Sequence, residues 1–212
     1  MTTVLPYLGP LQTALSYLSP GSWTSSGGSF KLAEDAGYDL TNIIVAKADE
    51  TGEAGFVEIG AGYAGFRSNQ VKGIKKLVEC AGDRMGRTIT ADFTNLTEWH
   101  DGLPNGVREH PGYAARDIAE LADAGVKLVD IIYSQVAADF EPRIGEFVRG
   151  SAELLKPSGL LIFNSAPEQQ KSFPAGNERE RLITETAASV GLQLERLVVL
   201  GGANGNLYVF KK

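Results

Sequence analysis

Cysteine is almost absent from this chain, and histidine is scarce as well. Cys80 is the only cysteine among 212 residues, and His100 and His110 are the only histidines. A single cysteine cannot form a disulfide within the chain, and there is no cysteine cluster that would hold zinc. The sequence therefore excludes a disulfide framework and a cysteine-based zinc site.

Long apolar runs and an excess of positive charge are missing too. No run approaches the roughly 20 apolar residues of a membrane span, and residues 1–18 lack the charged start of a signal peptide. Acidic residues outnumber basic ones by 26 to 20, which gives a formal net charge of -6. Because proteins that bind phosphate backbones usually present a basic face, we expect no nucleic acid partner. The lack of a membrane span and of a signal peptide leads us to expect no membrane contact and a cytoplasmic location.

The chain divides by pattern into a short N-terminal part, 1–55, and a regular remainder, 56–212. In the first part, residues 11–18 carry apolar side chains at helical spacing, and residues 20–29 form a loop rich in glycine and serine. The apolar run within 41–48 fits either a strand or a helix turn. We expect this N-terminal extension to cover the sheet and to act as a lid that selects the substrate.

From residue 56 onward, short apolar runs alternate with amphipathic segments, a rhythm that indicates an α/β fold with a doubly wound parallel sheet. We expect strands over 56–59, 88–93, 127–134, 160–163, 194–200 and 206–210, and helices over 68–81, 143–155 and 178–190. Between them, residues 95–111 read as a broken helix at best, 113–115 as a very short strand and 118–124 as one or two helical turns.

The final two strands depart from this rhythm. Only the five residues 201–205, rich in glycine and asparagine, separate them. Parallel neighbours need a long crossover, so this connection predicts a hairpin. The sheet should therefore be mostly parallel, with its last strand antiparallel.

Residues 56–65, with the sequence Phe-Val-Glu-Ile-Gly-Ala-Gly-Tyr-Ala-Gly, predict a strand that runs into a glycine-rich turn and then a helix. Glycine allows a sharp turn and a close approach of the backbone to a ligand. The spacing of Gly60, Gly62 and Gly65 satisfies the dinucleotide fingerprint G-x-G-x-x-G, which alone is weak evidence. Glu58 is awkward beside a pyrophosphate and suits a ligand that carries an amine or a positive charge.

Residues 58–65 resemble motif I of class I S-adenosylmethionine-dependent methyltransferases, in the form seen in proposed sugar O-methyltransferases. The resemblance implies a Rossmann-like fold with seven strands, in which the glycine turn packs against the methionine part of S-adenosylmethionine and the acidic residue organises that end of the site. It extends over about 56–212, since 129–134 resembles motif IV, 154–163 the helix, turn and strand that follow, and the closing hairpin the reversed seventh strand.

The same resemblance assigns two further aspartates. Asp92, at the end of the predicted second strand, would hold the ribose hydroxyls, with Asp83 as the fallback because the first helix would be unusually long. Asp117 would lie near the adenine amino group. The complete set of cofactor residues implied in this way is Glu58, Gly60, Ala61, Gly62, Tyr63, Gly65, Asp92, Phe93, Asp117, Ile118, Ser134 and Gln135.

Two departures from the family pattern bear on this assignment. Ala64 replaces a glycine that is common there, and the stretch between Asp92 and Asp117 is a poor helix. The sequence therefore departs from the family pattern on the adenine side of the pocket.

Methyl transfer needs orientation of the two reactants and often a base that deprotonates the acceptor. The candidate bases are His100, His110 and Asp139, with Glu141 close to the last of these. Loop histidines are more often structural than catalytic, so a surface or capping role is the alternative for each of the two histidines. The residues after the fourth predicted strand, 134–136, read Ser-Gln-Val, a poor site for a hard cation, and we expect no metal.

The sequence thus favours an S-adenosylmethionine-dependent methyltransferase that methylates an oxygen of a small molecule, with a sugar as one option. A nicotinamide-dependent oxidoreductase and a non-catalytic member of the same fold stay open as alternatives. Methylation of nucleic acid or protein is disfavoured by the acidic balance. The fourth predicted strand also lacks the Asn/Asp-Pro-Pro-Tyr/Phe type of motif that base-amino methyltransferases of this fold carry there. A homodimer also stays open.

Overall fold

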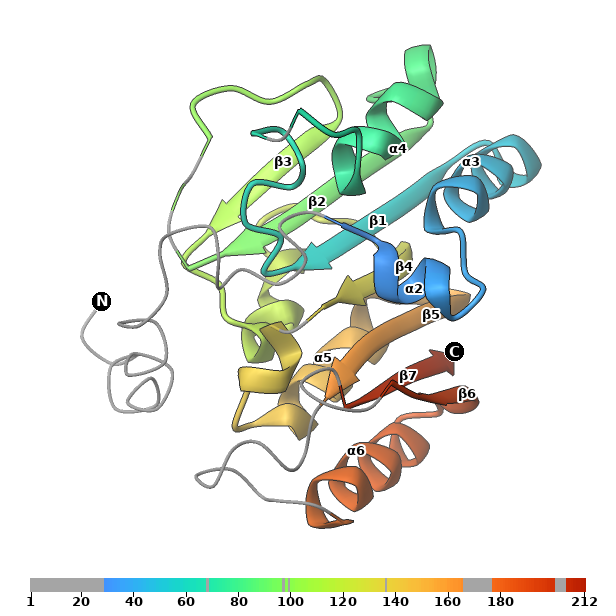
Figure 1. Ribbon diagram of the computed structural model, residues 1–212, viewed down its shortest axis with the longest axis vertical. Helices are drawn as coiled ribbons and strands as arrows, with labels where there is room; N and C mark the ends of the chain where they lie inside the picture. Colours follow the sequence, from blue (N-terminus) through green and yellow to red (C-terminus); the bar gives the residue numbers. More distant parts are fainter. Residues whose placement is uncertain are drawn as a thin grey trace.

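One mixed sheet of seven strands forms the centre of the molecule (Figure 1). The computed structural model describes residues 29–67, 69–96, 98, 100–135, 137–165, 177–200 and 205–212. Within these ranges the strand order is β3-β2-β1-β4-β5-β7-β6. The strands are β1 (Ala54–Ile59), β2 (Ile89–Asn95), β3 (Val107–Pro111), β4 (Val129–Ser134), β5 (Leu155–Ser165), β6 (Gln193–Val199) and β7 (Asn206–Lys211).

The first five strands run parallel, and β7 lies antiparallel between β5 and β6. The prediction of a mostly parallel sheet closed by a hairpin is therefore confirmed. Because β2 and β4 lie on opposite sides of β1, the chain changes its winding direction there. Crevices for ligands in such sheets lie at this switch point, beyond the carboxyl ends of the strands.

Helices cover both faces of the sheet. The α-helices are α2 (Lys31–Asp35), α3 (Leu40–Thr51), α4 (Gly73–Ala81), α5 (Ile144–Leu154) and α6 (Asn177–Ser189), and the 3-10 helices are η2 (Gly82–Arg84), η3 (Ala115–Ala122) and η4 (Ala137–Phe140). One core joins α2, α3 and α4 to the sheet face that carries Phe56, and the other joins η3, α5 and α6 to the face that carries Val57. Neighbouring residues of β1 thus pack alternately into the two cores. None of the described helices has the length and apolar character needed to cross a membrane.

The apolar run within 41–48 is helical, as part of α3. The Asp39 side chain accepts a hydrogen bond from the Asn42 backbone N–H at 3.1 Å and caps the helix start, and Gly52 ends it in the left-handed conformation. Leu40 and Ile44 of α3 are fully buried in the same core as β1. Residues 29–53 therefore pack as part of the sheet domain.

The expected lid segment stays a prediction. The helix expected over 11–18 and nearly all of the loop over 20–29 lie outside the described residues. The boundary expected between residues 55 and 56 falls inside β1, which begins at Ala54.

Two expected elements differ from the structure near the glycine turn. The helix expected over 68–81 begins only at Gly73, because Lys72 is extended and Gly73 itself has a φ of 58°. The strand expected over 113–115 is wrong, since the third strand is β3, inside the stretch read as a broken helix. A strand of five residues at the sheet edge, mostly polar and ending in proline, lacks the apolar run by which strands are recognised.

Two other strands are longer than expected. β2 continues to Asn95, so Asp92 lies three residues before its end. β5 starts directly after α5, and Ser158, with a φ of 65°, lies within it and not in a turn before it. A register shift against β4 accommodates this irregular start.

Candidate functional site

The glycine turn follows β1 at the switch point of the sheet. Gly60, Gly62, Ala64 and Gly65 all have positive φ, between 49° and 86°. A Cβ atom on Gly60 would lie 2.4 Å from the Ala137 Cβ. The turn therefore depends on glycine for its conformation and for its close contact with the protein itself.

The end of β2 holds the turn through hydrogen bonds. The Gly60 N–H donates to the Thr94 hydroxyl at 3.2 Å, and the Ala61 N–H donates to the Thr94 carbonyl at 3.2 Å. The Asn95 side chain accepts from the Gly62 N–H at 2.8 Å and donates to the Gly62 carbonyl at 3.0 Å. Three successive N–H groups of the turn are thus engaged by the protein, which disfavours a pyrophosphate ligand.

The start of α4 points the same way. Dinucleotide-binding folds present a helix N-terminus to the pyrophosphate directly after the glycine turn. Here α4 begins at Gly73, eight residues after Gly65. The glycine spacing of the fingerprint is present, but the helix N-terminus that gives the fingerprint its function is displaced along the chain.

His100 and Glu109 form a buried pair that fastens the turn from the β3 side. The His100 Nδ1 lies 3.0 Å from a Glu109 carboxylate oxygen, and the His100 Nε2 lies 3.2 Å from the Tyr63 carbonyl. The other Glu109 oxygen accepts from the Asn95 side chain at 2.5 Å. Both ring nitrogens of this candidate base are therefore engaged, and His100 bridges the glycine turn to β3. Glu109 was missed by sequence reasoning because its strand was not recognised.

Asp92 and His110 form a second pair on the opposite sheet face. The His110 Nε2 lies 2.7 Å from the Asp92 carboxylate, and Arg108 contacts the same carboxylate at 2.8 Å through Nε. Asp92 is almost fully buried, at the level of Val57 and not at the strand end. The end of β2 is Asn95, so the expected ribose contact of Asp92 stays a prediction that this geometry does not favour.

Glu58 and Tyr133 lie side by side at the ends of β1 and β4. Both are fully buried, on the sheet face covered by α2 and α3. Burial first, and the negative charge of Glu58 second, raise the pKa of the Tyr133 phenol well above its usual value. Tyr133 is therefore a neutral donor, and its hydroxyl donates to the Gln135 side chain at 2.7 Å.

The segment after β4 closes the other side of the turn. The Ser134 hydroxyl accepts from the Ala138 N–H at 3.0 Å and so caps η4, which brings Ala137 against Gly60. Ser134 was expected to contact the cofactor, and its hydroxyl is engaged within the protein. Gln135, the next residue, is partly exposed beside it.

Arg179 of α6 holds η4 from beneath. Its guanidinium donates to the backbone carbonyls of Ala138 at 2.9 Å, Asp139 at 3.1 Å and Glu141 at 3.0 Å, and to the Ser165 hydroxyl at 2.8 Å. The Ser165 hydroxyl in turn lies 3.3 Å from the Asp139 carboxylate. Burial lowers the pKa of Arg179, and Asp139 and Glu141 oppose that effect. Sequence reasoning missed Arg179, because an arginine in a polar helix carries no visible sign of burial.

The remaining expected residues divide into surface and core. Asp117 lies in the first turn of η3 and is partly exposed, with its carboxylate accepting from the Ala114 N–H at 2.9 Å. Ile118 and Phe93 are fully buried in the two cores. Asp83, the fallback for the ribose contact, lies in η2 at the far end of α4 from the turn. No cluster of metal ligands occurs among the residues that the structure describes.

The structure thus brings together the glycine turn, Glu58, Tyr133 and Gln135 at one edge of the sheet, with Asn95 and η4 on either side. Glu141 is withdrawn from this edge, because its carboxylate accepts from Arg116 and from the Arg143 N–H.

Comparison with solved structures places this architecture among known folds. The chain aligns with a proposed S-adenosylmethionine-dependent methyltransferase from Listeria monocytogenes with a TM-score of 0.53 at 12% identity, over 76% of this chain and 91% of that one. It aligns with a proposed sarcosine dimethylglycine methyltransferase from Galdieria sulphuraria with a TM-score of 0.51 at 16% identity, over 84% and 87%. A proposed hemolysin from Streptococcus thermophilus gives 0.50 at 15% identity, over 82% of this chain and 66% of that one.

These likenesses establish the fold, a Rossmann-like α/β sheet with an antiparallel seventh strand. No protein-family model matches the sequence, and no curated protein matches it.

Proposed function

We propose that this chain is a methyltransferase that uses S-adenosylmethionine and transfers the methyl group to an oxygen of a small molecule. The observation that carries the proposal is the glycine turn at the switch point, with the buried carboxylate of Glu58 two residues before Gly60. The antiparallel β7 and the fold shared with proposed methyltransferases support the same reading.

The chemistry of the residues at this edge fits S-adenosylmethionine better than a nicotinamide dinucleotide. A buried carboxylate favours a ligand whose near end carries an amine and a sulfonium charge. The N–H groups of residues 60–62 that a pyrophosphate would need are already engaged. When bound, S-adenosylmethionine would supply an electrophilic methyl group. We propose that Glu58 and the turn hold its amino acid end, and that Asp117 lies toward the adenine.

His110 is the residue we propose as general base. Because the Asp92 carboxylate only accepts hydrogen bonds, the His110 Nε2 carries the proton of their 2.7 Å contact. A neutral imidazole in this tautomer has its lone pair on Nδ1, which can accept a proton from an acceptor hydroxyl. His110 lies beside Thr94, whose hydroxyl holds Gly60, and Asp92 would act as its positioning residue.

A non-catalytic member of the fold is the second candidate. One observation favours it, namely that His100, Asp92, Ser134 and Glu141 are engaged within the protein. Such a protein would bind S-adenosylmethionine without turning it over.

Calorimetry with S-adenosylhomocysteine and with NAD tests the proposal. We expect binding of S-adenosylhomocysteine only, and an affinity about 10- to 100-fold lower in Glu58→Gln, which keeps the shape but removes the charge. Glu53→Gln, an exposed residue at the other end of β1, is the control and should bind like the wild type. Binding of NAD alone would overturn the proposal, and binding without turnover across a panel of hydroxyl acceptors would favour the second candidate.

A further inference from the structure

The two edges of the sheet differ in what they expose. The β3 edge has five residues, three of them ionisable, and it ends in proline, features that discourage pairing with another strand. The β6 edge has seven residues and pairs only with β7 among the described strands. It carries Leu194, Leu197 and Val199, which are 45%, 39% and 77% exposed. Edge strands with such apolar side chains are templates for pairing with another chain.

The three apolar side chains of β6 share one face. Their partners on β7 are Phe210, Tyr208 and Asn206, which alternate along that strand and so lie on a common face. A bulge after Leu194 inserts Glu195 as an extra residue, which keeps Leu194 and Leu197 on the same face although they are three residues apart. This is the face of the core that α6 covers.

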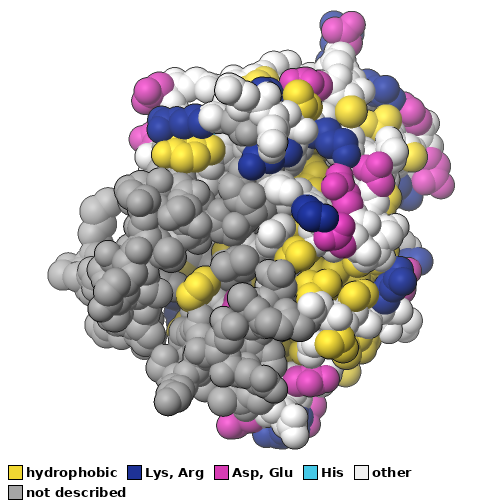
Figure 2. Space-filling view, viewed as in Figure 1, with side chains coloured by type: hydrophobic (Ala, Val, Ile, Leu, Met, Phe, Trp, Pro, Cys, Tyr) yellow, Lys and Arg dark blue, Asp and Glu magenta, His cyan; other side chains and the backbone are white. Residues whose placement is uncertain are grey.

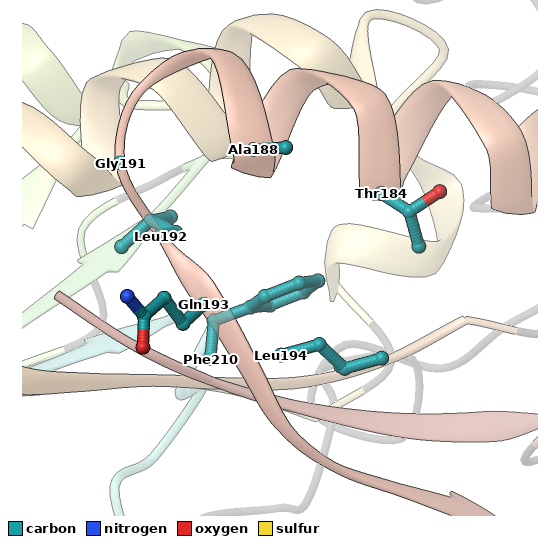
Figure 3. A pocket seen from close by; sticks show the side chains of 7 residues that line it. All are labelled: Thr184, Ala188, Gly191, Leu192, Gln193, Leu194 and Phe210. Carbon is teal, nitrogen blue, oxygen red and sulfur yellow. The ribbon is translucent and has the colours of Figure 1, made fainter.

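A hollow of about 430 Å³ opens on the same face, between the end of α6 and the start of β6 (Figure 3). The side chains of Thr184 and Ala188 lie on the α6 side of the hollow, and those of Leu194 and Phe210 lie on the sheet side. The full lining is Thr184, Ala188, Gly191, Leu192, Gln193, Leu194 and Phe210. Figure 2 shows hydrophobic side chains gathered at the lower right of the molecule, where Figure 1 draws β6 and β7.

We propose that two copies of this chain associate through their β6 strands, which pair antiparallel about a twofold axis between Glu195 and Arg196. In this register Leu194 of each copy lies opposite Leu197 of the other. Val199 then falls opposite Leu192 of the second copy, at the hollow. Each of the three exposed apolar side chains meets an apolar residue of the partner strand, as antiparallel pairing requires.

The charges on β6 support this register and a second copy of the chain as the partner. Glu195 of one copy lies opposite Arg196 of the other, so the axis brings together two pairs of opposite charges. Within its own chain the Arg196 guanidinium donates to the Ala36 carbonyl at 2.6 Å. An antiparallel register centred on Leu197 would instead place Glu195 opposite Val199.

Self-complementarity is what points to a second copy. A twofold interface uses the same surface twice, so one strand must supply both members of every contact. β6 does so with its two leucines, its two opposite charges, and an exposed valine at one end with the hollow at the other. Strand pairing alone covers less than the roughly 1,200 Å² of a standard stable interface. The dimer should therefore be weak and its population should depend on concentration.

Light scattering after size exclusion, over a concentration series, tests the surface. The wild type should rise from the monomer mass of 22.6 kDa toward twice that value as concentration increases. Leu197→Lys should shift the dissociation constant at least about 10-fold toward monomer, because it places a charge opposite Leu194. Leu128→Lys is the matched control, since Leu128 is 50% exposed on another part of the surface. A wild type that stays monomeric, or a Leu197→Lys variant that dimerises equally well, would overturn the proposal.

Cross-linking tests the register on a Cys80→Ser background. Opposed residues of antiparallel strands bring their Cβ atoms close to disulfide distance. A mixture of Leu194→Cys and Leu197→Cys chains should form a covalent dimer under mild oxidation, whereas either variant alone should not. A dimer from Leu197→Cys alone would overturn this register and indicate one centred on Leu197. Both variants change exposed side chains, and circular dichroism would verify their folding.

Discussion

The two sides of the glycine turn are fixed by different chemistry. On the β2–β3 side, ionisable side chains pair with each other, His100 with Glu109 and His110 with Asp92. On the β4–β5 side, the single guanidinium of Arg179 binds backbone carbonyls and a serine hydroxyl. Carbonyl partners cannot titrate and are insensitive to the identity of their side chains. The first side therefore depends on several ionisable residues, whereas the second depends on Arg179 together with the Ser134 hydroxyl that caps η4.

The largest expected effect is on the β4–β5 side. Arg179→Met should lower the free energy of unfolding by about 3 to 5 kcal/mol, because a buried hydrogen-bonded charge is removed and its acceptors lose their donor. Urea denaturation measures the loss. Arg181→Met is the matched control on the same helix, since Arg181 is exposed in an i,i+4 pair, and it should cost less than about 0.5 kcal/mol. Equal losses for the two variants would show that Arg179 does not hold η4.

The next effect tests the β2–β3 side through chemistry. His110→Ala should lower kcat about 100-fold or more, as loss of a general base does, while the affinity for S-adenosylhomocysteine stays within about twofold. His100→Ala should give the opposite pattern, a weaker affinity with a smaller change in kcat, because His100 supports the turn. Steady-state kinetics and calorimetry on both variants separate the roles. An unchanged kcat in His110→Ala would leave this side with a structural function only.

A smaller effect concerns the turn itself. Asn95→Ala removes two hydrogen bonds to Gly62 and one to Glu109, which should cost about 2 kcal/mol of unfolding free energy. Because the loss loosens the turn that faces the ligand, affinity for S-adenosylhomocysteine should fall with stability. Asn42→Ala, at an exposed helix start, should affect neither the affinity nor more than about 1 kcal/mol of stability. A destabilised variant with wild-type affinity would show that the Asn95 hydrogen bonds do not support ligand binding.

The smallest expected effect is a loss of stability at alkaline pH. The raised pKa of Tyr133 means that the unfolded chain loses the phenol proton near pH 10 while the folded protein keeps it. The stability contributed by the neutral phenol is therefore complete below pH 10 and falls above it, by up to about 1.4 kcal/mol per pH unit. Urea denaturation at pH 9 and pH 11 should show a steeper loss for the wild type than for Tyr133→Phe. Other alkaline effects are common to both proteins, so parallel losses would contradict the burial of an ionisable phenol here.

Much of the fold could be predicted from particular residues. The runs that form β1 and β4 are apolar because both sheet faces are covered, and the short connection before β7 forces a hairpin. β3 could not be predicted, since a five-residue edge strand with three successive ionisable side chains and a final proline resembles a loop in sequence. The start of α4 was also misplaced, because Lys72 is extended and its carbonyl lies against Gly65, a contact that no local pattern shows.

The candidate site divides in the same way. Glu58, the glycines and their place after β1 follow from a local motif, and the structure puts them at the switch point. Asp92 was assigned by its place at the end of the predicted second strand, whereas its partners are set by the neighbouring strand, where Arg108 and His110 reach its carboxylate. Arg179 and Glu109 are far in sequence from the turn they support.

The sequence by itself determined the alternation of strands and helices, the turn with Glu58 before it and the reversed last strand. Those properties depend on apolar periodicity, on glycine conformation and on connection length, all of which act over a few residues. Tertiary structure alone decided which polar groups meet, from the pairs His100–Glu109 and His110–Asp92 to the four contacts of Arg179. The reason is that buried polar groups take their partners from whichever segment packs nearby, and the order of strands in the sheet sets that proximity.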